Sequence, residues 1–113
     1  VRAVNKARAY IETHYYLDIC LEEFARQVYL SPYYLSRGFT ELTGVSFTDY
    51  LKAIRIKKAQ SLLLTTNISV AQAAQRVGYS DPNYFSRVFK SVTGRTPQQY
   101  RQGKKATPHD CAN

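Results

Sequence analysis

The 113-residue sequence has no methionine, no tryptophan and only two cysteines. No apolar run exceeds three residues, as at 62–64, whereas a membrane-spanning helix needs about 20. Cys20 and Cys111 form no CxxC pair, so neither a disulfide framework nor a cysteine zinc site is predicted, and a reducing cytoplasm is expected. No secretory leader is visible. The chain opens on Val1 within a predicted helix, so we expect a piece of a longer protein.

Acidic residues are scarce in the second half of the chain. Residues 1–49 hold five basic and six acidic residues, whereas residues 50–109 hold eleven basic residues and one acid, Asp81. The net charge is +8, and 44% of the residues are hydrophobic, enough for a packed core. A compact body with such one-sided positive charge suits a polyanion, either nucleic acid or an anionic membrane surface.

The chain repeats itself. PYYLSRGFTELTGVSFTDY (32–50) aligns with PNYFSRVFKSVTGRTPQQY (82–100) at an offset of 50, with eight of nineteen positions identical. Upstream the match continues at an offset of 49, where apolar residues with i, i+3, i+4, i+7 spacing predict a short amphipathic helix in each copy. We therefore expect two equivalent units.

Each copy has a tight break followed by a second helix. Ser31 and Asp81 are suited to be N-caps with proline at the first helical position, and Gly44 and Gly94 are suited to end these helices. A helix, a turn of three or four residues and another helix is the spacing of a helix-turn-helix motif, and it occurs twice.

A long helix is predicted to join the two units. Its start has a capping signature at 46–49, and its apolar residues cover more than half of its circumference. With a leading helix near 2–15, the prediction is an all-α fold of about seven helices. The expected parts are a first helix-turn-helix subdomain (1–45), a linker helix (46–66), a second helix-turn-helix subdomain (67–103) and a polar tail (104–113).

A helix-turn-helix motif places its second helix in the major groove and exposes the side opposite its core contacts. We expect Leu35, Phe39 and Leu42 to face inward in the first copy, and Phe85, Phe89 and Val92 in the second. The candidate base-reading residues face outward: Tyr33, Ser36, Arg37, Asn83, Ser86 and Arg87. Arginine pairs with guanine, asparagine with adenine, and tyrosine contacts thymine methyls.

The predicted linker helix also supports a DNA-binding function. Its length of about 30 Å is close to one duplex turn of about 34–36 Å, so one chain is expected to read two successive major-groove segments. Arg55 is expected to pair internally or to extend its charged end along the helix to solvent, rather than to read DNA. Candidate phosphate contacts are Ser31, Lys52, Lys57, Lys90, Arg95, Thr96 and Arg101.

Residues 21–101 resemble the paired helix-turn-helix domain of AraC/XylS-type bacterial transcription regulators. The stretches that carry the resemblance are IRIKKAQSLLLTTNISVAQAAQRVG (54–78) and VGYSDPNYFSRVFKSVTGRTPQQYR (77–101). The resemblance implies sequence-specific binding to promoter or operator DNA, an absent upstream sensor or receiver domain, and RNA polymerase as a partner. It also places the base contacts on the six residues given above. VYLSPYYLSR and GYSDPNYFSR are more similar to members fused to phosphoreceiver domains than to sugar-sensing members.

Three departures are expected to weaken the first unit. Gly38 lies within a helix where the second copy has Val88, at a cost of about 1 kcal/mol in helix propensity. Thr40 replaces the basic residue found at Lys90, and Cys20 occupies a cap position that a thiol fills poorly.

Two other classes of function compete with DNA binding. An enzyme is not expected, because neither His14 nor His109 has a partner at triad or metal-site spacing, and no cofactor or metal is predicted. The alternative is a helical protein-docking module with a tyrosine-rich surface. It predicts binding to protein that is insensitive to salt, and no binding to duplex DNA.

Overall fold

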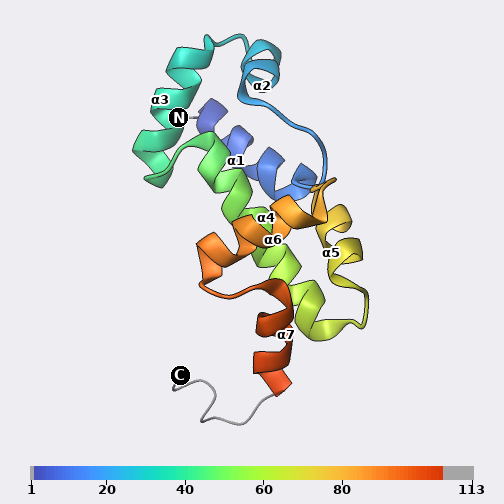
Figure 1. Ribbon diagram of the computed structural model, residues 1–113. Helices are drawn as coiled ribbons and strands as arrows, with labels where there is room; N and C mark the ends of the chain where they lie inside the picture. Colours follow the sequence, from blue (N-terminus) through green and yellow to red (C-terminus); the bar gives the residue numbers. More distant parts are fainter. Residues whose placement is uncertain (1, 106–113) are drawn as a thin grey trace. The chain divides into compact units, whose positions relative to one another are not determined.

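The computed structural model describes residues 2–105, with side chains through residue 103, and this range forms seven α-helices (Figure 1). They are α1 (Arg2–His14), α2 (Leu21–Gln27), α3 (Pro32–Thr43), α4 (Phe47–Thr65), α5 (Val70–Arg76), α6 (Pro82–Thr93) and α7 (Pro97–Lys105). The all-α fold and the seven helices are confirmed. None of the described helices is both long and apolar enough to span a membrane.

The chain divides into two compact units, and the border lies inside helix α4, between Arg55 and Ile56. The N-terminal part of α4 supplies Phe47 to the core of the first unit. The part of α4 in the second unit carries the buried residues Ile56, Ala59 and Leu63. The predicted linker is thus an unbroken helix that contributes to both units. Helix α7 runs two residues into the predicted tail, and residues 106–113, with His109 and Cys111, lie outside the described range.

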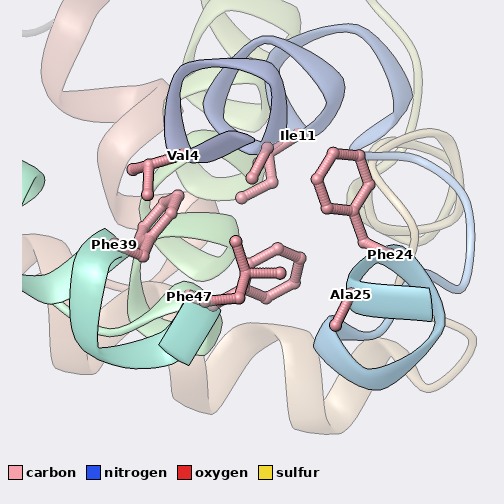
Figure 2. Packing of buried hydrophobic residues seen from close by; sticks show 8 residues of the cluster. Val4, Ile11, Phe24, Ala25, Phe39 and Phe47 are labelled. Carbon is pink, nitrogen blue, oxygen red and sulfur yellow. The ribbon is translucent and has the colours of Figure 1, made fainter. Parts of the chain in front are cut away.

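The core of the first unit is built from helices α1, α2, α3 and the start of α4. Figure 2 shows Val4 and Ile11 of α1, Phe24 of α2, and Phe39 of α3 directed toward one another around Phe47. The ring centroids of Phe39 and Phe47 are 5.6 Å apart, a distance at which aromatic pairs attract. Burial of each such ring stabilises the fold by about 1.5–3 kcal/mol. Val4, Ala7 and Ile11 form the buried stripe of α1.

The core of the second unit contains a chain of aromatic rings. Tyr79 contacts Phe85, Phe85 contacts Phe89, and Phe89 contacts Tyr100, with centroid distances of 5.5, 5.7 and 5.5 Å. These rings come from the turn after α5, from α6 and from α7. They fix one face of α6 in the interior and leave its opposite face exposed.

The predicted helix ends are confirmed in both copies. The side chain of Ser31 accepts a hydrogen bond from the Tyr34 amide, and that of Asp81 from the Asn83 amide. Gly44 and Gly94 end α3 and α6 with φ of 84° and 86°, in the left-handed region that favours glycine. Cys20 precedes α2 without a side-chain cap, as expected. Because the caps fix where α3 and α6 begin, they also fix which side chains face outward.

Gly38 has a packing role that the sequence did not predict. A Cβ atom at this position would lie 3.0 Å from Cγ2 of Val4, closer than most real contacts. The missing side chain therefore lets α1 approach α3 at this position.

One part of the predicted inward stripes is wrong. Leu35, Phe39, Phe85 and Phe89 are fully buried, but Leu42 and Val92 are 44% and 46% exposed. Both lie in the last turn of their helices, just before the left-handed glycine, where the chain turns away.

Candidate nucleic-acid interface

Helix α3 presents its polar face because its apolar face is anchored. Leu35 and Phe39 are fully buried, so residues about half a turn away point to solvent. Of the predicted base-reading residues, Tyr33 is 66% exposed, Arg37 is exposed, and Ser36 is half-buried at the flank. The exposed face therefore carries a phenol and a guanidinium one turn apart.

Helix α6 repeats this arrangement. Phe85 and Phe89 are fully buried, Asn83 and Arg87 are exposed, and Ser86 is half-buried. Lys90, one turn after Ser86, is also exposed. The three predicted base-reading residues of α3 and the three of α6 thus have the same pattern of exposure. The second unit adds a positive charge where the first has Thr40.

The arginines of the two helices differ in their polar contacts. Nε of Arg37 donates to Oε2 of Glu41 at 3.3 Å, and its Nη1 donates to the hydroxyl of Tyr33 at 3.3 Å. The residue that corresponds to Glu41 in α6 is Ser91, so the second helix has no acid at this position. Glu41 was not among the predicted site residues. The repeat alignment contained a signal for this residue, because it pairs Glu41 with Ser91.

The candidate phosphate contacts are spread over several elements. Lys57 and Lys90 are exposed, whereas Lys52, Arg95 and Thr96 are half-buried. Nζ of Lys52 lies 3.8 Å from a carboxylate oxygen of Asp49, one turn earlier on α4. The side chains of Lys52 and Asp49 are 40% and 61% exposed, so the pair is weak and leaves Lys52 available to a phosphate.

Capping hydrogen bonds already engage polar groups of Ser31 and Thr96, the two candidate contacts at helix N-termini. The Thr96 amide donates to Oε1 of Gln99 at 3.0 Å, and the Gln99 amide donates back to the Thr96 hydroxyl. This reciprocal capping box occupies the Thr96 amide. The hydroxyl of Ser31 accepts from the backbone of α3, so its side chain acts first as a cap.

Arg101 lies in a setting that does not suit a phosphate contact. Its Nε donates to the carbonyl of Leu63 at 3.0 Å, and its Nη2 donates to the carbonyls of Ile68 and Thr66 at 2.6 and 3.4 Å. The Leu63 carbonyl lies in the last turn of α4, and the Thr66 and Ile68 carbonyls follow its end, where carbonyls lack helical partners. Arg101 of α7 therefore caps the C-terminus of α4.

Arg55 does the same in the first unit and confirms the expectation that it pairs internally. Its Nε and Nη2 donate to the carbonyls of Tyr15 and Leu17, just after the end of α1, at 2.7 and 2.8 Å. In each unit the last helix thus carries an arginine that caps the first helix. Both arginines therefore stabilise the position of a helix end.

The described residues contain no group of three or more His, Cys, Asp or Glu that could hold a metal ion. The polar side chains of α3 and α6 instead form two exposed rows of hydrogen-bond donors and acceptors. Such rows match the chemistry of base edges in a major groove.

Comparison with known proteins supports this interpretation of the surface. A family model described as a helix-turn-helix domain matches residues 24–103. The regulatory protein PocR of Salmonella typhimurium is 38% identical over 106 residues, which are 94% of this chain and 35% of PocR. The chain thus spans about a third of that relative's length.

Two solved structures are similar over nearly the whole chain. The C-terminal domain of AraT, a response regulator from Geobacillus stearothermophilus, has a TM-score of 0.90 and 39% identity, covering 96% of this chain and 90% of that one. The DNA-binding domain of the global transcriptional factor AdpA, solved with a target DNA, has a TM-score of 0.85 and 28% identity, covering 90% and 92%. Both match a fold in which two helix-turn-helix units occur in one chain.

Proposed function

The chain belongs to the AraC/XylS-type family of bacterial transcription regulators, and we propose that its two recognition helices read adjacent major-groove segments of one operator. Membership makes the chain a DNA-binding output domain rather than an enzyme. The observation that carries the proposal is the repeated placement of Arg37 and Arg87, both exposed at the centre of a polar helix face.

The outward side chains have distinct roles in this proposal. Arg37 and Arg87 donate two hydrogen bonds each to O6 and N7 of guanine, and Asn83 pairs with N6 and N7 of adenine. Tyr33 contacts thymine methyl groups through its ring. Ser36 and Ser86, half-buried at the flank, donate to base edges or to the nearest phosphate.

The remaining contacts position the domain on the duplex without reading sequence. We assign this role to Lys52, Lys57, Lys90 and Arg95, with Ser31 and Thr96 as weaker polar contacts at helix ends. Arg101 is left out of this set because three backbone carbonyls surround its guanidinium.

The rest of the protein is proposed on the same basis. PocR is about three times as long as the matched region, and AraT is a response regulator, so we propose an additional sensor or receiver domain for this chain. A transcription regulator acts on chromosomal DNA, so we propose a cytoplasmic location for the protein and RNA polymerase as a partner.

Fluorescence anisotropy with a randomised 30-bp duplex pool at several salt concentrations, followed by sequencing of the bound fraction, tests the proposal. We expect a steep salt slope and enrichment of two motifs about one helical turn apart. One enriched motif would limit base reading to a single unit. No binding at low salt would overturn the proposal and favour the protein-docking module.

The role of Arg87 has a direct test. Arg87→Ala is expected to lower affinity for the enriched site by about 1–3 kcal/mol and to relax selection at one base position. Its effect on random-sequence DNA is expected to be smaller, because a single phosphate contact adds little. An equal loss on both kinds of DNA would remove Arg87 from the base-reading set.

A further inference from the structure

An exposed row on α3 links three polar side chains that lie one helical turn apart. Arg37 stands in the middle, with the Tyr33 hydroxyl on one side and the Glu41 carboxylate on the other, each at 3.3 Å. The side chains of Arg37 and Glu41 are 63% and 69% exposed. Arg37 is therefore partly neutralised on the same face that is proposed to meet DNA.

The second recognition helix has the arginine without these neighbours. The corresponding row on α6 is Asn83, Arg87 and Ser91, all three exposed. No ion pair involves Arg87 among the residues that the structure describes. Helix α6 carries a second positive charge, Lys90, in addition to Arg87. The two recognition helices thus differ in charge although their folds are equivalent.

The same asymmetry extends over the two units. Residues 1–55 hold seven basic and six acidic residues, whereas residues 56–113 hold nine basic and two acidic residues. Attraction to phosphates does not depend on sequence and scales with the number of positive charges that approach them. Sequence-independent affinity is therefore expected to come mainly from the second unit.

Glu41 changes what Arg37 gains from each kind of DNA contact. To bind a phosphate, Arg37 must give up its contact with the Glu41 carboxylate for a contact with another anion. The phosphate also repels Glu41, because both are negatively charged. A guanine offers two acceptors in a bidentate geometry, which changes affinity by about 5- to 150-fold. An exposed pair at i, i+4 spacing changes an equilibrium by only about twofold. Glu41 thus opposes a phosphate contact both by competition for Arg37 and by repulsion, whereas the neutral acceptors of guanine are not repelled.

We propose that Glu41 is a specificity-determining residue, which restrains Arg37 so that the first recognition helix binds DNA mainly through base edges. This inference rests on the proposed DNA-binding function and adds a division of roles to it. The second unit supplies most of the sequence-independent attraction in addition to its own base contacts, whereas the first unit contributes mainly selection among sequences.

Three single substitutions in the full chain test the proposal. Glu41→Gln removes the charge and keeps the shape. Asp18→Asn makes the same change of charge at an exposed position between α1 and α2, outside α3. Ser91→Glu places the missing acid beside Arg87 in the second unit. Circular dichroism checks that each variant is folded, and anisotropy measures affinity for random-sequence duplex and for the duplex enriched from the pool.

We expect Glu41→Gln to raise affinity for random-sequence duplex by about two- to fivefold at low salt, and to lower the ratio of specific to random affinity. Ser91→Glu is expected to lower random affinity by a similar factor, and Asp18→Asn to change it less. Equal gains from Glu41→Gln and Asp18→Asn would overturn the inference, because net charge alone would then explain them. An unchanged ratio of specific to random affinity in Glu41→Gln would also overturn the inference. Both results would leave the DNA-binding function intact, whereas wild-type protein that binds no duplex would overturn that function and this inference together.

Discussion

The hydroxyl of Tyr50, in the first turn of α4, donates a 2.7 Å hydrogen bond to Oε2 of Glu12, near the end of α1. The bond joins the first and last helices of the first unit, across 38 positions of sequence. Burial, and then this bond to a carboxylate, raises the pKa of Tyr50 from 10.0 to about 12. Neither partner was a predicted site residue, and the bond lies apart from the outward rows.

A pH dependence follows from this contact. Because the pKa is higher in the folded protein, the unfolded chain loses the Tyr50 proton first as the pH rises. The contribution to stability is therefore complete below pH 10 and declines between pH 10 and about 12. Tyr50→Phe is expected to lower the free energy of unfolding by about 1 kcal/mol at pH 7 and to lose less stability over that window. Urea unfolding at several pH values measures both effects, and parallel pH profiles for the two proteins would contradict the assignment.

The contact between Gly38 and Val4 predicts a steric effect. Gly38→Val, which copies the residue of the second unit, is expected to lower the free energy of unfolding by about 1–3 kcal/mol because the new side chain meets Val4. Val4→Ala in the same chain is expected to recover part of that loss. Urea unfolding of the two single variants and the double variant measures the coupling. Additive effects would show that the two residues do not limit each other.

The uncapped start of α2 predicts a stabilising substitution. Cys20→Ser supplies a hydroxyl at a cap position with extended backbone, where the thiol makes no side-chain cap bond. It is expected to raise the free energy of unfolding by about 0.5–1 kcal/mol. The reverse change at the equivalent position, Ser69→Cys, breaks an intact capping box before α5 and is expected to cost a similar amount. Thermal unfolding compares the two, and a loss of stability in Cys20→Ser would contradict the cap argument.

The assignment of Arg101 as a structural cap separates it from the lysines proposed to contact phosphates. Arg101→Met is expected to lower the free energy of unfolding by about 1–3 kcal/mol, because it leaves carbonyls at the end of α4 without partners. Its salt slope in DNA binding is expected to stay the same. Lys57→Met is the matched control, with little loss of stability and a salt slope reduced by about 1. A reduced slope for Arg101→Met would return it to the phosphate set.

Local signals in the sequence were enough for the boundaries of α3 and α6. Ser31, Asp81, Gly44 and Gly94 act on backbone atoms within four residues of themselves, so their types alone predicted where α3 and α6 begin and end. With the boundaries set, the buried phenylalanines determined which face of each helix was exposed. The outward placement of the six base-reading candidates followed from these two steps, and their contacts with DNA remain predictions.

Contacts between residues far apart in the chain were not predictable in the same way. Arg101 reaches carbonyls 33 to 38 positions away, and Gly38 is matched to Val4 on another helix. The repeat offset of 50 also hides the similarity of Arg55 and Arg101, which are 46 positions apart. Equivalent capping was reached from different helical positions, so alignment of the two copies does not reveal it.

Helix α4 has an evolutionary consequence, because the border between the compact units falls inside it. Gene duplication and recombination exchange protein modules most easily where the chain between them is a loop. Here any crossover between the copies would cut a helix whose Phe47 completes one core and whose Leu63 is buried in the other unit. One of the two units would then lack the buried residues that α4 contributes to its core. Selection is therefore expected to act against such crossovers, so that the two helix-turn-helix motifs are inherited together as one module.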